Sequence, residues 1–178
     1  MSIVKTVRLK PEKETSIRNR HRWVFSGAIA DAMGAQDGEE VRIADSKGVF
    51  LGRGTYHSKT SIAIRVHAFD ETTFEDAIRN SVSSAKRLRE TLFDPERTNA
   101  YRLVHSEADG LPGIVVDRYA DSLVVQVSTL AAEMRKNVLI DALVSEFSPK
   151  TIVEKSNLPS RKEEGLPPFE GVLYGEGR

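Results

Sequence analysis

The sequence predicts an α+β protein in which a small N-terminal β-barrel is followed by a small α/β domain with a mixed sheet and two helices. Three observations support this fold class. The first third of the chain contains short runs in which apolar and polar residues alternate, as in half-buried strands. An amphipathic helix comes next. After it, the order strand, helix, strand predicts a crossover connection, so part of the second sheet should be parallel.

The predicted barrel consists of short strands, and the segment before the second of them, residues 12–22, is polar. Ser46–Gly48 has the composition of a hairpin turn. Gly52 and Gly54 lie inside one strand, where glycine indicates a bulge or a close approach of two backbones. The expected strands span residues 3–10, 23–29, 39–48, 49–57 and 61–69.

The helix after the barrel is expected over residues 73–93, where apolar residues recur at helical spacing. Thr73 with Asp76, and equally Thr72 with Glu75, fit the spacing of a capping box at its start. Because this helix separates the run of strands from the crossover unit, it is the natural boundary between the two domains.

The second domain is expected to begin with a hairpin whose tip carries two turn dipeptides, Asp109-Gly110 and Pro112-Gly113. A helix is expected over residues 131–147, where Ser148-Pro149 ends it. A Pro-rich loop is expected over residues 161–171. The expected strands of this domain span residues 101–106, 113–119, 122–129, 151–157 and 171–176.

The composition is that of a soluble globular protein, with 39% hydrophobic and 29% charged residues. No apolar run approaches the roughly 18 residues that a membrane-spanning helix needs, and the N-terminus lacks the layout of a signal peptide. We therefore expect a cytoplasmic protein. The sequence contains no cysteine, which excludes disulfides, thiolate metal ligands and a cysteine nucleophile within these residues.

The net charge is zero, but the charges are unevenly distributed. Residues 1–69 contain 12 Lys and Arg against 7 Asp and Glu, whereas the remainder is acidic. Such asymmetry suggests a polyanion partner for the basic part, although a solvated surface would look the same. A cluster of cations and aromatics in the polar segment and the strand after it fits an RNA platform, because guanidinium groups bind phosphates and aromatic rings stack on bases. Its members are Arg18, Arg20, His21, Arg22, Trp23 and Phe25.

The aromatic residues of this cluster have a second interpretation. Trp23 and Phe25 could instead belong to the core of the barrel, with the arginines simply solvated, because tryptophan is buried on average.

A second group of candidate RNA-binding residues lies in and after the glycine-rich strand: Arg53, Tyr56, His57 and Lys59. There the glycines would let a nucleic-acid backbone approach closely, and the cations would contact its phosphates. The alternative interpretation is that the group is simply a polar hairpin loop. Neither group has the spacing of metal ligands.

Two carboxylates, Glu107 and Asp109, lie at the hairpin tip and follow His105. A carboxylate pair can act as acid and base in glycoside hydrolysis. However, their position in a turn fixes neither their separation nor their direction, so an Asx-type turn at Asp109 and a solvated Glu107 is the favoured interpretation. The sequence has no GxGxxG after a strand, no P-loop, no nucleophile elbow and no HExxH.

Four segments together, in this order, resemble the N-terminal part of bacterial methyltransferases that modify C5 of cytosine in 23S ribosomal RNA. These segments are RHRWVFSGAI, LGRGTYHSKTSIAIRV, YRLVHSEADGLPGIVVDRYAD and EGLPPFEGVLYGE. The resemblance implies a PUA domain over residues 1–72, then a central α/β domain over residues 73–178. It also implies that a Rossmann-like domain, which binds S-adenosylmethionine and carries the catalytic cysteine, follows in the full-length protein. That family usually has Pro in place of Arg22, and Gly in place of Ser106 and Ala120.

By this resemblance the chain is the RNA-recognition and substrate-positioning fragment of the methyltransferase, with ribosomal RNA and the missing catalytic domain as partners. It should be inactive alone, because it has neither cofactor domain nor thiol. Glu107 and Asp109 would then form a loop that faces the substrate or the missing domain, where charge reversal lowers activity without unfolding. Alternatives are a stand-alone RNA-binding or protein-binding module, including a homodimer, and a related PUA methyltransferase that acts on another base.

Overall fold

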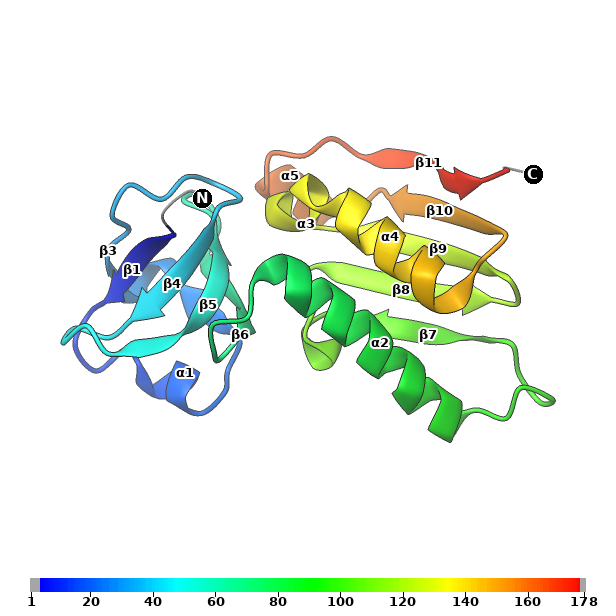
Figure 1. Ribbon diagram of the computed structural model, residues 1–178. Helices are drawn as coiled ribbons and strands as arrows, with labels where there is room; N and C mark the ends of the chain where they lie inside the picture. The colour runs from blue at the N-terminus through cyan, green and yellow to red at the C-terminus, as the bar shows by residue number, and fades with distance from the viewer. Residues whose placement is uncertain (1–3, 177–178) are drawn as a thin grey trace. The chain divides into compact units, whose positions relative to one another are not determined.

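The computed structural model describes residues 4–176, and the contacts divide the chain into two compact units, Met1–Ala77 and Ile78–Arg178. The division falls within the first turns of the helix that follows the N-terminal strands. The α+β fold class is confirmed: the first unit holds a sheet that is curled as a half-barrel, and the second holds a mixed sheet with helices (Figure 1).

The first unit contains a six-stranded sheet with the order β2-β6-β5-β4-β1-β3. Among its described strands, only β1 and β4 pair in parallel. Its core is aliphatic, with Val7, Ile43 and Ile64 fully buried. The elements are β1 (Lys5–Leu9), α1 (Thr15–Arg18), β2 (Trp23–Phe25), the 3-10 turn η1 (Ser26–Ala28), β3 (Ile29–Asp31), β4 (Glu40–Ala44), β5 (Phe50–Tyr56) and β6 (Ile62–Ala68).

Two local features of this unit differ from the sequence-based expectation. The polar segment contains a short helix, α1, whose single buried residue, Ile17, joins the core. The strand expected over residues 23–29 is interrupted by η1, so β2 and β3 pair with different partners, β6 and β1. One apolar residue is too weak a signal for a helix, and the break lets one continuous segment supply both edges of the curled sheet.

Gly52 and Gly54 confirm the predicted bulge and close backbone approach in β5. The register of β5 with β4 shifts between Phe50 and Gly52, and its register with β6 shifts between Arg53 and Gly54. A Cβ atom on Gly52 would lie 2.6 Å from the carbonyl oxygen of Ala68, and one on Gly54 would lie 2.5 Å from Cγ2 of Ile64. A larger residue at either position would therefore push β6 away from β5.

The helix predicted over residues 73–93 is present as α2 (Phe74–Leu92). Of the two possible capping boxes, the one formed by Thr73 and Asp76 is used: Oγ1 of Thr73 accepts a hydrogen bond from the Asp76 N–H at 3.1 Å and donates to its carboxylate at 2.8 Å. The apolar stripe is buried from Phe74 to Ala85, but Leu92 is 63% exposed.

The second unit contains a five-stranded sheet with the order β11-β10-β9-β8-β7. Strands β9 and β10 pair in parallel, as the crossover predicted, and the other pairs are antiparallel. Helices α2 and α4 lie on the same side of this sheet (Figure 1). The elements are β7 (Ala100–His105), the 3-10 turn η2 (Ser106–Asp109), β8 (Ile114–Tyr119), β9 (Ser122–Val127), α3 (Leu130–Met134), α4 (Lys136–Phe147), β10 (Thr151–Ser156), α5 (Pro159–Glu163) and β11 (Phe169–Gly175).

The two helices expected in the second domain become four among the described residues. The helix expected over residues 131–147 is broken at Arg135, whose φ of −114° and ψ of 19° end α3 before α4 begins. Helix α5 occupies part of the expected Pro-rich loop and begins with Pro159, which favours the first turn of a helix because its φ is fixed.

Ser106 and Ala120, the two positions where the resembled family usually has Gly, both adopt a left-handed backbone, with φ of 49° and 53°. Left-handed φ strains any residue with a Cβ atom, by about 1–2 kcal/mol. Ala120 is exposed and follows β8. We expect Ala120→Gly to raise the free energy of unfolding by about 0.5–1 kcal/mol, because relief of strain outweighs the entropy that glycine adds to the unfolded chain.

Urea denaturation of the whole chain measures this effect, and Ala108→Gly is the control. Ala108 is also exposed but lies in η2 without a positive φ, so the same substitution there should destabilise. If Ala120→Gly also destabilised the protein, the strain at this connection would be unimportant.

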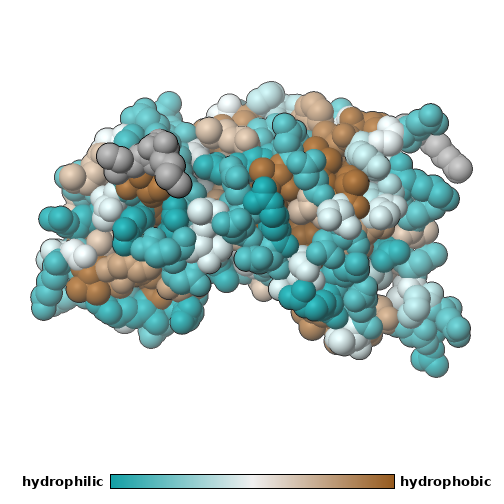
Figure 2. Space-filling view, viewed as in Figure 1, coloured by the Kyte–Doolittle hydropathy of each residue, from teal (hydrophilic) through white to brown (hydrophobic). Residues whose placement is uncertain are grey.

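Within residues 4–176, no helix is long and apolar enough to cross a membrane. The same residues contain no group of three or more His, Asp or Glu side chains arranged to hold a metal ion. The face shown in Figure 2 carries hydrophobic patches among hydrophilic residues.

Candidate nucleic-acid interface

Three rings follow one face of β2 and the residues before it. His21, Trp23 and Phe25 alternate with buried Val24, so strand periodicity turns their side chains away from the core. The His21 and Trp23 rings lie 5.7 Å apart, and the Trp23 and Phe25 rings 6.4 Å apart, both edge to face. Phe25 is 52% exposed. The interpretation of Trp23 and Phe25 as core residues is therefore wrong for Phe25, while Trp23 is half-buried.

A hollow of 340 Å³ lies beside these rings, and Lys13, Trp23, Phe25 and Gly27 help to line it. Lys10 lies close to the same turn, since its Nζ donates to the carbonyl of Gly27 at 2.9 Å. A wall of aromatic carbon with ammonium groups at its rim can contact both the base and the phosphate of a nucleotide.

The end of α1 places Arg20 in an unusual conformation. The Arg20 N–H donates to the carbonyl of Ile17 at 2.8 Å, and the His21 N–H donates to Ser16 at 2.9 Å, which is the pattern of a Schellman motif. That motif requires a left-handed residue, usually glycine, but here it is Arg20 with φ of 63°. The chain therefore carries a cation at a position where its backbone is strained.

Arg20 and Arg22 converge on one ring, that of Phe69. Their guanidinium carbons lie 4.8 Å and 5.4 Å from its centroid. Arg22 is half-buried and also donates to the carbonyls of Val66 at 3.1 Å and His67 at 3.0 Å. Arg20 is exposed, so its charge faces solvent while that of Arg22 holds the end of β6.

Arg18 is half-exposed and forms an ion pair with Asp45 at 2.8 Å. The carboxylate of Asp45 shapes the predicted turn after β4, because it accepts hydrogen bonds from the N–H groups of Lys47 and Val49, each at 2.9 Å. The hydrogen bond from Val49, together with the charge of Arg18, lowers the pKa of the Asp45 carboxyl. The guanidinium of Arg18 is thus held by Asp45 and is still partly exposed to solvent.

Arg53, a predicted RNA-binding residue, is 8% exposed and lies in a buried polar cluster. Its Nε lies 3.1 Å from Oε1 of Glu40, and its NH1 donates to the carbonyl of Glu71 at 2.9 Å. Glu40 also accepts the Phe74 N–H at 3.0 Å, and Nε2 of His67 lies 3.2 Å from it. The cluster ties β4, β5 and β6 to the start of α2. Burial alone would raise the pKa of Glu40, but the hydrogen bond from His67 and the charge of Arg53 lower it.

The other members of the second predicted group differ in exposure. Tyr56 packs against the core of the first unit, and His57 is 7% exposed with Nε2 4.0 Å from the carboxylate of Asp37. Lys59 is exposed. The structure therefore exposes only the lysine of this group fully.

At the hairpin tip, Asp109 is nearly buried and bound to α2. Its carboxylate oxygens accept two hydrogen bonds from Arg89, each at 2.8 Å, and one accepts the His105 N–H at 2.7 Å. The side chains of Arg89 and Asp109 are 12% and 10% exposed. The expected Asx-type turn is not formed, because the bonded N–H precedes the aspartate in the chain.

Glu107 at the same tip is half-buried rather than solvated, and it accepts a hydrogen bond from the hydroxyl of Ser106 at 2.5 Å. That hydroxyl also accepts the Gly113 N–H at 3.0 Å. The two carboxylates at this tip therefore accept hydrogen bonds from different partners.

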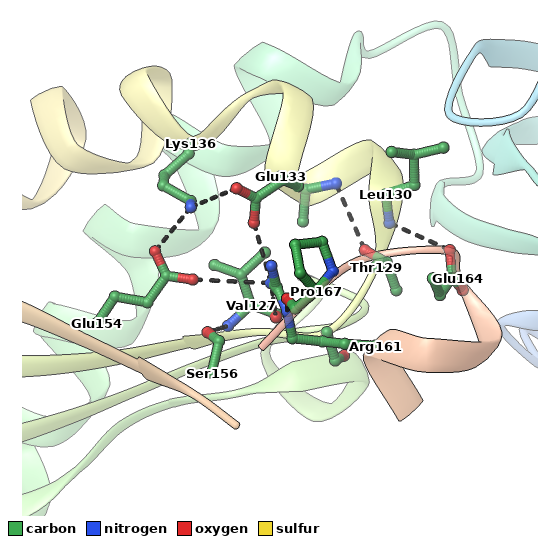
Figure 3. A network of polar contacts seen from close by, with 12 residues as sticks. Val127, Thr129, Leu130, Glu133, Lys136, Glu154, Ser156, Arg161, Glu164 and Pro167 are labelled. Carbon is green, nitrogen blue, oxygen red and sulfur yellow. Dashed lines mark hydrogen bonds and ion pairs between the residues drawn. The ribbon is translucent and has the colours of Figure 1, made fainter. Parts of the chain in front are cut away.

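A buried cluster of charges lies at the carboxyl ends of the parallel strands β9 and β10 (Figure 3). Arg161 is 2% exposed and donates to the carbonyls of Val127 at 2.7 Å and Pro167 at 2.8 Å, and to the carboxylate of Glu133 at 3.0 Å. Glu154 is fully buried, with one oxygen 2.7 Å from Nζ of Lys136 and the other 3.7 Å from Arg161.

This cluster contains two carboxylates and two cations, so its net charge is zero. Neither oxygen of Glu154 accepts a well-directed hydrogen bond from the described residues, which leaves that carboxylate dependent on the nearby charges. Burial would raise the pKa of Glu133, but hydrogen bonds from Lys136 and Arg161 lower it. The cluster fixes the segment that connects β10 to β11.

Sequence reasoning missed two residues of the candidate interface. Arg65 lies directly across from Trp23 in the pairing of β2 with β6, so both side chains share one face of the sheet. Phe69 supplies the ring under Arg20 and Arg22. No local pattern marks either residue, because strand pairing and the left-handed turn at Arg20 bring them to this surface.

Comparison with known proteins identifies residues 7–69 as a PUA-like domain, as the resemblance implied. "Ribosomal RNA large subunit methyltransferase I" of Shewanella denitrificans is 39% identical over 174 residues, which cover 96% of this chain and 44% of the relative. The protein of the same name from Photobacterium profundum is 40% identical and covers 92% of this chain and 42% of the relative. The chain thus spans less than half the length of these relatives.

Among solved structures, a candidate SAM-dependent methyltransferase from Streptococcus mutans superposes with a TM-score of 0.81, covering 98% of this chain and 44% of that chain. A candidate methyltransferase in complex with SAH superposes with a TM-score of 0.80 over the same shares. Both are 15% identical to this chain, so they show a common fold.

Proposed function

We propose that this chain is the RNA-recognition and substrate-positioning part of an S-adenosylmethionine-dependent ribosomal RNA methyltransferase. The observation that carries the proposal is the exposed surface of cations and rings on the PUA-like domain. The relatives named as ribosomal RNA methyltransferases support the same substrate class. The proposed target atom is C5 of cytosine in 23S ribosomal RNA, which rests on the family resemblance of the four sequence segments.

In this proposal the exposed members of the predicted RNA-binding set contact phosphate directly: Arg18, Arg20, His21 and Lys59. Arg22, Arg53, Tyr56 and His57 support that surface from inside the domain, because their polar groups or rings contact the protein. Phosphate contacts position the RNA, while Trp23 and Phe25 offer ring surface to an unpaired base.

The second unit would hold the substrate toward a catalytic domain supplied by the full-length protein. The residues of this chain do not fit S-adenosylmethionine. The carboxyl ends of β9 and β10, where an α/β sheet usually binds a cofactor, are filled by the side chains around Arg161 (Figure 3). No thiol is present to add to a pyrimidine. Methyl transfer therefore belongs to the full-length protein in this proposal.

The test is binding of a ribosomal RNA hairpin as a function of salt. We expect the double variant Arg20→Gln, Lys59→Gln to bind about 5–10-fold more weakly at physiological salt, with the slope of log affinity against log salt lower by about 2, because two phosphate contacts are lost. The matched control is Arg87→Gln, Lys155→Gln, which removes two exposed cations from the second unit.

An equal loss in both double variants would mean that charge alone matters and not this surface. Absence of RNA binding at low salt would refute the proposal. In that case, a dimer seen by light scattering without RNA affinity would favour a protein-interaction module.

A further inference from the structure

A pocket of 340 Å³ lies in the second unit between the end of α2, the loop that follows it, and the strands β7 and β8. Its size is at the lower end of the range of about 300–1,000 Å³ for small-ligand sites. We call it the Tyr101 pocket and define it by Phe93, Pro95, Thr98, Asn99, Tyr101 and Arg118. It lies outside the PUA-like domain and contains none of the predicted site residues.

The apolar part of the Tyr101 pocket is a stacked pair of rings. The rings of Phe93 and Tyr101 lie 4.7 Å apart with an angle of 20° between their planes. Neither ring is fully buried. Pro95 adds apolar surface in the loop, whose shape is fixed by Asp94, because its carboxylate and carbonyl accept hydrogen bonds from three following N–H groups. The rings are therefore held in place before any ligand arrives.

The polar part of the pocket has hydrogen-bond donors and acceptors that the described residues leave unpaired. Arg118 donates from Nε to the carbonyl of Ala120 at 2.8 Å and from NH1 to the hydroxyl of Tyr101 at 3.1 Å. These bonds orient the guanidinium, and its NH2 makes no hydrogen bond to the residues that the structure describes. Asn99 is exposed, and its side-chain amide has no partner among the same residues. Arg97, in the same loop, has a side chain that is 86% exposed.

We propose that the Tyr101 pocket binds an unpaired nucleobase of the RNA strand. A base can continue this stack on the outer face of the ring pair, its edge of donors and acceptors can meet the Asn99 amide, and its phosphate would meet Arg118. Glu90 is the only acid among the described residues that line the pocket, and the charge of Arg89 is already balanced by Asp109, so Arg118 makes the site suitable for an anionic nucleotide. This inference rests on the proposed RNA-binding function and assigns a second contact to it.

The test compares single-stranded RNA that contains 2-aminopurine with the matching duplex, using the full chain. Tyr101→Leu and Asn99→Ala should each weaken binding of the single strand, Tyr101→Leu by about tenfold because a stacked base is lost. Binding of the duplex should stay unchanged, since its bases are paired. The control is Tyr119→Leu, which removes an aromatic ring that is 54% exposed in the same hairpin but outside the pocket.

A second measurement separates this site from the proposed function. Adenosine 5′-monophosphate should shift the amide NMR signals of Thr98, Asn99 and Arg118. If RNA binds and depends on Arg20, while the pocket variants and the nucleotide titration have no effect, the pocket is refuted and the proposed function stands. If the nucleotide shifts these signals but RNA does not bind, the pocket is a nucleotide site and the proposed function fails.

Discussion

Replacement of Arg161 by Met is expected to lower the free energy of unfolding of the second unit by about 3–5 kcal/mol. The guanidinium is 2% exposed and balances two carboxylates, one of which, on Glu154, is fully buried. Removing one partner of a buried charge network leaves an uncompensated charge in a medium of low dielectric constant. Met fills a similar volume, so the loss reflects charge and hydrogen bonds more than a cavity. Urea denaturation with amide exchange of β9 and β10 measures it.

Two further variants separate charge balance from packing. Lys162→Met, which changes an exposed cation in the same helix, should alter stability by no more than about 0.5 kcal/mol. The double variant Arg161→Met, Glu154→Leu should be more stable than Arg161→Met alone, because Lys136 and Glu133 then remain as a neutral pair. A loss below about 1 kcal/mol in Arg161→Met would show that water reaches the cluster.

Those parts of the fold that rest on periodicity and turn chemistry were predicted from the sequence. The alternating strands, the capped helix α2 and the parallel pair β9 and β10 all follow from local patterns. Features that depend on distant contacts were not. Helix α1 exists because Ile17 reaches the core, and the parallel pairing of β1 with β4 joins segments separated by a long stretch of chain. Local sequence does not encode either contact.

The candidate site divides in the same way. The sequence marks the cations and aromatics of the polar segment, since residue type alone indicates RNA chemistry. It does not say which cations are exposed: Arg18 and Arg20 are exposed, whereas Arg53 is buried against Glu40, and both outcomes suit an arginine. Likewise, RKEEG reads as part of a polar loop, although Arg161 within it is the largest of the fully buried side chains in the described part of the chain. Partners far along the chain decide these outcomes.

Replacement of Asp109 by Ala is expected to destabilise the second unit by about 2–4 kcal/mol. The substitution leaves the nearly buried guanidinium of Arg89 without its carboxylate and the His105 N–H without its acceptor. The expectation from sequence was that charge reversal at this tip would spare the fold. Because Asp109 is buried against α2, we instead expect Asp109→Lys to lower the free energy of unfolding more than Asp109→Ala does. In the Lys variant, two cations face each other. Denaturation with amide exchange over residues 105–113 measures both variants.

The double variant Arg89→Ala, Asp109→Ala tests the cause, because removing both charges should cost less than the two single losses added together. Glu96→Ala is the surface control, since Glu96 is exposed in the loop after α2. Additive losses in the cycle would mean that Arg89 and Asp109 act separately. Coupling above about 1 kcal/mol would instead assign the acidic tip to the fold, where Asp109 holds the hairpin on α2 and thereby positions the Tyr101 pocket, which Arg89 also lines.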